Sequence, residues 1–406
     1  EEVGNLCLAA VGICGPIVTL LSSFGTLVGI GGSIWLSMCL GQKNEKRASQ
    51  ILYNSFVMLV VLSICLTLGF ILLKHNLIYW FGGSDALYPY ANTYLTIYTL
   101  GTFFALMSIG LNYFITGQGY ATIAMLSVCI GAITNIIFDF ILIRTLKIGV
   151  AGAAIGTVIA QFLSCMFVLC FLRFKTKIKL KKEELSIDKM KHIVKLGFSP
   201  FLILASDSVI LIVMNMMLQK YGGNMGDIYI SAITVAQSYF LLITGPLLGI
   251  SSGTQPIYAY HFGAKNLKKI KEAFKIIISF AFLFCFVMFI ISMCYSNVFV
   301  SMFTSDAMTM PIADRAIKIF CLGILMMSIQ YVLVDGITGL SNVKLSLFLS
   351  LNRKMMYLGC TCLLPAFLGV SNIFYAQPIA DIYASIVTAI CFIKIIPSYL
   401  KSHGVK

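Results

Sequence analysis

The chain has 406 residues, of which 59% are hydrophobic and only 11% are charged, and its mean hydropathy is +0.94. This composition excludes a water-soluble domain of that length, because so few charges cannot cover its surface. The formal net charge of +14 does not indicate nucleic-acid binding, since a basic rim facing the membrane explains it.

Apolar segments recur from one end of the chain to the other, and each is long enough to cross about 30 Å of hydrocarbon as a helix. A membrane barrel would instead show alternating segments of about 10 residues. The sequence therefore predicts an all-α, polytopic membrane protein. The predicted spans are 6–38, 50–73, 87–116, 121–143, 149–172, 192–219, 227–259, 273–295, 313–338, 345–368 and 374–397.

The chain repeats itself. GQKNEKR at 41–47 aligns with GAKNLKK at 263–269, and ITG at 115–117 aligns with ITG at 337–339, both at an offset of 222 residues. This offset pairs the last five spans with the first five and leaves 192–219 without a counterpart. We therefore expect two six-helix lobes in parallel repeat, with eleven spans in this chain and the first helix of the full protein missing from it.

The lobes are predicted at 1–172, which would hold spans 2–6 of the full protein, and at 191–406, which would hold spans 7–12. The basic stretch RFKTKIKLKKEELSIDKM at 173–190 joins them. This linker and most of the 29 Lys and Arg residues fall in one alternate set of loops. The excess of positive charge places that set, and the C-terminus with it, in the cytoplasm of a multi-pass plasma-membrane protein.

Four acidic residues lie within the predicted spans, where an acid near the bilayer centre costs on the order of 3 kcal/mol. They are Asp139, Asp207, Asp335 and Asp381. Asp207 is the most central, and no Lys or Arg shares its span at that depth. For Asp139, a surface ion pair with Arg144 or Lys147 is the alternative. For Asp335, hydration or helix capping is the alternative. A buried acid without such a partner indicates a binding role.

Neutral polar residues lie at the same depth. Asn135, Gln161, Gln237 and Gln255 are predicted to form hydrogen bonds between helices, each worth about 0.6 kcal/mol, or to line an ion and substrate site together with the acids. The Cys and His residues show no metal-binding spacing. We therefore expect no cofactor, metal or catalytic residue, and only a coupling ion.

Three stretches resemble the multidrug and toxic compound extrusion (MATE) family. The stretch 131–161 has the family's Asn, Asp and Gly-Val-Ala-Gly-Ala-Ala turn, 253–273 begins GTQPIYAY, and 369–384 carries a Gly-rich turn, Pro and Ala-Asp. The resemblance covers essentially the whole chain and implies cation-driven export of organic, usually cationic, compounds. Positions that match the family are Asn135, Asp139, Gln161, Gln255, Arg353 and Asp381. Asp207 lies on the helix where some members place a coupling acid.

These observations predict a monomeric secondary antiporter, surrounded by membrane lipids, that exports small organic cations in exchange for H+ or Na+ by alternating access. A lipid-linked oligosaccharide flippase of the same superfamily is an alternative, and it would need a more basic cavity to hold pyrophosphate. A membrane-embedded enzyme would need clustered His, Ser or metal ligands at depth. A channel would need a filter-like loop, and the sequence shows neither feature.

Overall fold

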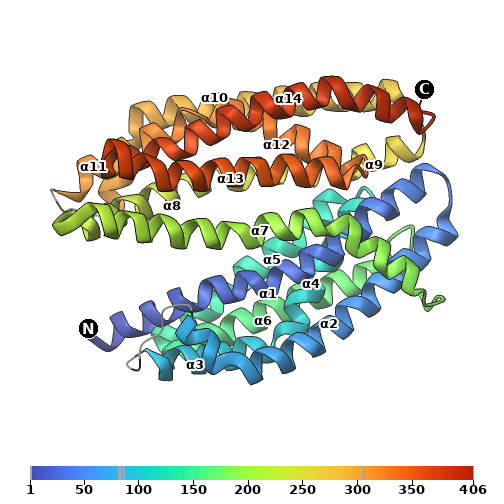
Figure 1. The fold of residues 1–406 in the computed structure, drawn as a ribbon. Coiled ribbons are helices and arrows are strands. Elements are labelled where there is room, and N and C mark those ends of the chain that lie inside the picture. The colour runs from blue at the N-terminus through green and yellow to red at the C-terminus, as the bar shows by residue number, and fades with distance from the viewer. Residues whose placement is uncertain (1, 81–84, 86, 304–305, 307, 406) are drawn as a thin grey trace. The chain divides into compact units, whose positions relative to one another are not determined.

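The computed structural model describes residues 2–80, 85, 87–303, 306 and 308–405. Within the helices, the description leaves out the side chains of residues 2–9, 12, 13, 16, 204, 205, 207–209, 211, 212, 224 and 227. Every element in the described chain is helical, which confirms the predicted all-α class (Figure 1). The elements are α1 (Glu2–Gly41), α2 (Glu45–Trp80), α3 (Tyr88–Leu100), α4 (Thr102–Gly117), α5 (Ala121–Asp139), η1 (Phe140–Thr145), α6 (Val150–Phe174), α7 (Ile187–Gly222), η2 (Gly223–Met225), α8 (Gly226–Gly253), α9 (Gln255–Gly263), α10 (Leu267–Phe303), α11 (Thr309–Cys321), α12 (Ile324–Gly339), α13 (Val343–Leu368), η3 (Val370–Tyr375) and α14 (Ala376–Ser402).

Most predicted spans coincide with helices that are long and apolar enough to cross a membrane. Among the described residues there are seven such helices, or nine spans if each bent pair counts as one. The bent pairs are α3 with α4, at 55°, and α11 with α12, at 49°. The other two predicted spans, 192–219 and 345–368, coincide with α7 and α13, and α13 carries Arg353 and Lys354 within its length.

The backbone repeats at the offset found in the sequence. Adding 222 to the bounds of α4 gives those of α12, and adding it to the bounds of α2 gives those of α10 to within one residue. The bend repeats as well, because Gly101 separates α3 from α4 and Gly323 lies between α11 and α12. Left-handed backbone recurs too, with φ of 59° at Lys43 and 55° at Lys265. The duplication therefore reaches the details of individual turns.

The chain divides into two compact units, Glu1–Ala205 and Ser206–Lys406. The boundary falls inside α7, later in the chain than the basic stretch 173–190. The first half of α7 packs on α1. A Cβ atom on Gly197 would overlap the carbonyl of Leu27, and the rings of His192 and Trp35 lie 4.4 Å apart between centroids. These close contacts assign the start of α7 to the first unit.

In the first unit, α1 packs against α2 and α4, and α5 packs against α6. The α1–α4 contact depends on small residues, since a Cβ on Gly29 would lie 2.7 Å from the carbonyl oxygen of Gly110. A buried apolar cluster that includes Ile17, Leu21 and Tyr98 joins α1 to α3 and α6. The pairing of α5 with α6 brings their polar side chains together.

In the second unit, the counterparts of these helices form the same pairs. Helix α8 contacts α10, α11 and α12. Helix α14 packs against both α12 and α13 (Figure 1). The α12–α14 and α13–α14 contacts bring the buried polar residues of three helices to one place.

Candidate functional site

Asn135 and Asp139 lie one turn apart on α5, and they face Thr157 of α6. The Asn135 amide donates to Asp139 Oδ1 over 3.5 Å and to Thr157 Oγ1 over 3.3 Å. The Thr157 hydroxyl donates to the backbone carbonyl of Ala153 over 2.9 Å. A carboxylate, an amide and a hydroxyl thus meet within the first unit, between two predicted membrane spans.

Asp139 lies where the helix changes its hydrogen-bond pattern. It is the last residue of α5, and the chain continues as the π-helix η1. Such segments are rare, and they often occur at functional sites. The facing residue on α6 is Gly156, where a Cβ would lie 2.5 Å from Asp139 Oδ1. Only glycine therefore leaves room for the carboxylate in this position.

The described residues form four ion pairs, and their acidic members are Glu45, Glu272, Asp314 and Asp381. Asp139 belongs to none of them. Arg144, which the sequence suggested as its partner, lies with its guanidinium 5.6 Å from the ring centroid of Phe140. The negative charge of Asp139 is therefore not neutralised by a described basic side chain.

A cavity of about 260 Å³ lies beside this carboxylate group in the first unit. Its lining residues are Ser108, Ile109, Asn112, Val128, Gly131, Ala132, Asn135, Thr157, Ala160, Gln161 and Ser164. The amide nitrogens of Asn112 and Gln161 already form hydrogen bonds. Asn112 donates to Ser127 Oγ over 2.8 Å, and Gln161 donates to Tyr98 Oη over 3.1 Å.

The amide oxygens of Asn112 and Gln161 are buried and have no hydrogen-bond partner in the described structure. Buried polar atoms are almost always satisfied in proteins, so these two acceptors indicate a missing donor. Both residues line the cavity, whose surface is otherwise mainly apolar, and their unsatisfied acceptor oxygens suit a cation, water or a hydrogen-bond donor rather than an anion.

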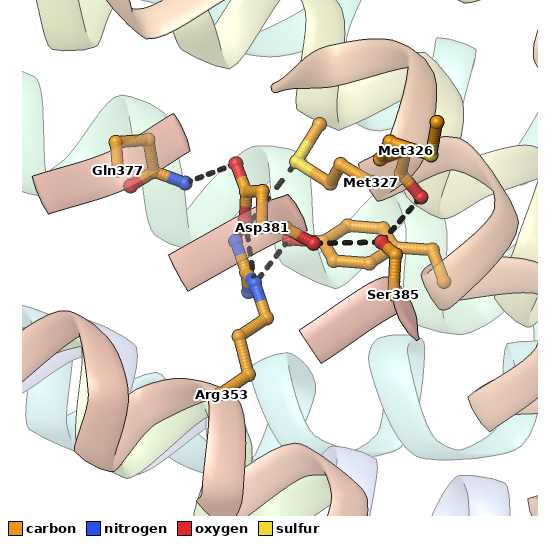
Figure 2. Close-up of polar contacts among 7 residues, drawn as sticks. Met326, Met327, Arg353, Gln377, Asp381 and Ser385 are labelled. Atoms are coloured by element: carbon orange, nitrogen blue, oxygen red, sulfur yellow. Dashed lines mark hydrogen bonds and ion pairs between the residues drawn. The ribbon is translucent and has the colours of Figure 1, made fainter. Parts of the chain in front are cut away.

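Asp381 has a different environment in the second unit, shown in Figure 2. Arg353 Nε of α13 lies 2.8 Å from Asp381 Oδ1 of α14, and the carboxylate is 0% exposed. Gln377, one turn earlier on α14, donates its amide to Asp381 Oδ2 over 2.9 Å. Both carboxylate oxygens thus have a partner.

The Arg353 guanidinium is held on its other side by α12. Nη1 donates to Tyr331 Oη over 3.3 Å, Nη2 lies 3.9 Å from Met327 Sδ, and the guanidinium carbon is 5.1 Å from the Tyr331 ring centroid. The Ser385 hydroxyl donates to the carbonyls of Asp381 and Met326, which joins α14 to α12. In this arrangement the charge of Asp381 is compensated, and the pair joins three helices.

Asp335 of α12 faces Gln255 of α9. The Gln255 amide donates to Asp335 Oδ1 over 2.8 Å, and the Ser251 hydroxyl also interacts with this carboxylate. Asp335 belongs to none of the described ion pairs. The nearby Tyr258 is fully buried, and its hydroxyl has no hydrogen-bond partner within the described chain. A second uncompensated carboxylate thus lies in the second unit.

The sequence-predicted residues therefore fall into separate groups. Asn135 and Gln161 line the first-unit cavity, and Asp139 contacts Asn135. Gln255 lies with Asp335. Gln237 belongs to neither group, and its amide donates to Met214 Sδ over 3.9 Å. The side chain of Asp207 lies outside the described residues. Thr157, Asn112 and Tyr331 were not predicted, because a single Thr, Asn or Tyr on an apolar helix carries no distinguishing sequence signal.

The sequence profile of the MatE family matches residues 1–141 and 203–354. The chain belongs to the MatE family. This confirms the predicted family and the prediction of a membrane transporter rather than an enzyme.

Similar proteins include two called multidrug export protein MepA. The protein of Staphylococcus haemolyticus is 24% identical, and the match covers 92% of this chain and 82% of the relative. That of Staphylococcus saprophyticus is 23% identical with the same coverage. Among solved structures, "MATE in the bent conformation" superposes with a TM-score of 0.92 at 22% identity, over 99% of this chain and 90% of that one. An outward-facing multidrug resistance MATE transporter gives a TM-score of 0.91 at 22% identity, over 97% and 89%. This MatE chain thus shares its fold with transporters of known structure.

Proposed function

We propose that this MatE protein is a secondary antiporter that exports organic cations in exchange for H+ or Na+ by alternating access. The observation that carries the proposal is the Asp139 carboxylate, which lies within a predicted span, contacts Asn135 of the cavity lining and has no ion-pair partner among the described residues. An uncompensated intramembrane acid is costly, and such acids usually mark an ion or substrate pathway.

The chemistry of the cavity agrees with a cationic ligand. Asp139 and the Thr157 hydroxyl supply oxygen atoms that can hold a proton or a small hard cation, and the Asn135 amide donates to both of them. The unpaired amide oxygens of Asn112 and Gln161 add two acceptors on the same wall. Binding of an ion at Asp139 would remove the attraction for an organic cation, so the two ligands favour different states of the protein.

The names of the relatives agree with this proposal, since both MepA proteins are called multidrug export proteins. A lipid-linked oligosaccharide flippase is less well supported. It would need free basic groups to hold pyrophosphate, whereas the buried basic side chains of the described chain are Arg353 and Lys354, and Arg353 is paired with Asp381.

Energetics limit what one exchanged ion achieves. One proton moving over one pH unit supplies about 1.4 kcal/mol. Exchange of one proton for one monovalent organic cation moves no net charge, so the membrane potential adds nothing. Such an exchange allows about tenfold accumulation per pH unit, and a steeper gradient needs a second ion for each substrate molecule.

The proposal is tested by transport in proteoliposomes loaded with a fluorescent monovalent organic cation. A pH gradient and a sodium gradient are imposed separately on the wild-type protein and on Asp139→Asn. We expect one gradient to drive transport in the wild type, and we expect the variant to lose gradient-driven transport while its helical circular dichroism is unchanged. The neutral amide keeps the shape of the side chain but cannot carry the ion.

Asp188→Asn is the matched control, because Asp188 is an exposed acid in the first turn of α7. It should transport like the wild type. Transport by Asp139→Asn at the wild-type rate under both gradients would refute the role of this acid. Uptake of a pyrophosphate-linked lipid, without transport of organic cations, would instead favour the flippase.

The distribution of Lys and Arg supports a plasma-membrane orientation with the C-terminus in the cytoplasm. A green fluorescent protein fused after Lys406 tests this, since the fluorophore matures in the cytoplasm. A fluorescent fusion is expected, and an alkaline phosphatase fusion at the same place should be inactive.

A further inference from the structure

A cavity of about 480 Å³ lies within the second unit, at the end where α10 begins and α14 ends. Its lining residues are Leu267, Ile270, Lys271, Phe274, Phe392, Ile393, Ile396, Pro397, Leu400, Lys401 and Val405. This volume falls in the range of about 300–1,000 Å³ that is usual for small-molecule sites. The cavity is apolar except for its two lysines.

The floor of this cavity is built from buried apolar side chains of both helices, among them Ile270, Phe274 and Ile396. The rings of Phe274 and Phe392 meet edge to face with centroids 4.9 Å apart. This contact joins α10 to α14 at the floor of the cavity. The floor is therefore set by packed side chains and does not depend on a ligand.

The chain after α14 adds a further part of the wall. Gly404 adopts a left-handed φ of 69°, and the Val405 amide donates to the carbonyl of Leu400 over 3.1 Å. This turn reverses the backbone after the helix, and it buries the Val405 side chain against the cavity. Glycine is favoured at 404 because it adopts this φ without the steric cost that a side chain adds.

Lys271 and Lys401 lie at the rim, where both are exposed. Neither takes part in a described ion pair, and the acid next to Lys271, Glu272, is bound to Lys269 at 2.9 Å. Two ammonium groups thus stand over an apolar cavity. A cationic drug would be repelled here, whereas an anion with an apolar body would be attracted.

An apolar surface continues from the cavity along both helices. Ile393 is 71% exposed, and Ile390 of α14 and Ile276 and Phe280 of α10 are also exposed. Both helices are long and apolar enough to span a membrane. Side chains of this kind on a spanning helix face lipid chains, so the cavity opens toward the bilayer.

We propose that this cavity binds one anionic phospholipid of the surrounding leaflet. Its phosphate lies between Lys271 and Lys401, and an acyl chain fills the apolar floor beside Ile393. Basic pockets between spanning helices commonly bind anionic lipid headgroups. A soluble phosphate compound would leave the apolar floor unfilled, which is why the observations favour a lipid. The inference is independent of the drug and the ion proposed above.

The test uses the purified full chain in detergent micelles and native mass spectrometry with phosphatidylglycerol or phosphatidylcholine of identical acyl chains. We expect one phosphatidylglycerol molecule to remain bound at concentrations where phosphatidylcholine dissociates. A lysine near an anionic headgroup contributes about fivefold to binding, so Lys271→Gln with Lys401→Gln should weaken phosphatidylglycerol binding roughly 25-fold, and each single variant about fivefold.

Lys268→Gln with Lys275→Gln is the matched control, because it also removes two positive charges, here from the beginning of α10 near Lys271, but leaves the cavity lining intact. This control should keep the wild-type affinity. Equal binding of the two lipids by the wild type, or an unchanged affinity in the Lys271/Lys401 variant, would overturn the proposal. Displacement of the lipid by equimolar glycerol phosphate would overturn it too, since that result would identify a soluble phosphate site.

Discussion

Arg353 of α13 and Asp381 of α14 form a buried ion pair, with 2.8 Å between Nε and Oδ1. This pair separates the intramembrane acids into two kinds. Asp381 is compensated and holds helices together, whereas Asp139 and Asp335 have no ion-pair partner among the described residues. We expect substitution of the compensated acid to lower the stability of the protein. We expect substitution of an uncompensated acid to impair transport.

Arg353→Met should destabilise the protein strongly, because it leaves the fully buried Asp381 carboxylate without its counter-charge. Removal of one partner of a buried ion pair costs about 3–5 kcal/mol. Asp381→Asn should have a similar effect through the unpaired guanidinium. The measurement is the thermal unfolding midpoint of the purified protein in detergent.

The double variant Arg353→Met with Asp381→Asn should recover part of that loss, since no unpaired charge remains. Lys318→Met is the control, because its pair with Asp314 is partly exposed and should contribute less than about 1 kcal/mol. Additive losses in the double variant would show that the two residues do not act as a pair.

Gly156→Ala should impair ion coupling without loss of folding. The added methyl group would lie 2.5 Å from Asp139 Oδ1, so the carboxylate must leave its present position beside Asn135. A displacement that weakens ion binding by about 1.4 kcal/mol raises the half-saturating ion concentration tenfold. Transport rate against pH or sodium concentration measures this shift.

Gly69→Ala is the control, because a Cβ at this position of α2 would meet nothing within 4 Å and Gly69 does not line the cavity. It should keep the wild-type ion dependence. If Gly156→Ala also transports with an unchanged half-saturating concentration, the position of the Asp139 carboxylate does not matter for coupling.

Asp335→Asn should lower the steepest substrate gradient that the protein builds. Two uncompensated carboxylates allow two protons per monovalent substrate, which corresponds to about 100-fold accumulation per pH unit at zero membrane potential. With one carboxylate, the limit falls to about tenfold. Steady-state substrate ratios in proteoliposomes, with valinomycin and potassium to clamp the potential, distinguish the two values. A wild-type ratio that never exceeds tenfold would contradict a coupling role for Asp335.

Asp207→Asn tests the acid that the sequence ranked first. Because Asp207 is the most central acid of its predicted span, we expect the variant to lose ion-driven efflux and to keep its helical content. Its rate is compared with that of Asp139→Asn in the same vesicles. Undiminished efflux would remove Asp207 from the coupling machinery and leave Asp139 as the acid to which coupling is assigned.

Some hydrogen-bond partners could be predicted from the sequence. Gln377 and Asp381 are four residues apart on one helix, and so are Asn135 and Asp139, so that each pair shares a helix face by geometry alone. Hydrogen-bond partners on different helices could not be predicted. Gln255 and Asp335, for example, are 80 residues apart, and no local sequence pattern connects them.

Apolar span length and repeated blocks are local properties of the chain, so the helical class, the eleven segments, the offset of 222 and the family resemblance could all be predicted from the sequence. Which acid is neutralised depends on how the helices pack. Arg353 and Asp381 lie on different helices, and their charges meet because α13 packs against α14. No such packing brings a described base to Asp139, where Gly156 and Thr157 of α6 leave room for the carboxylate.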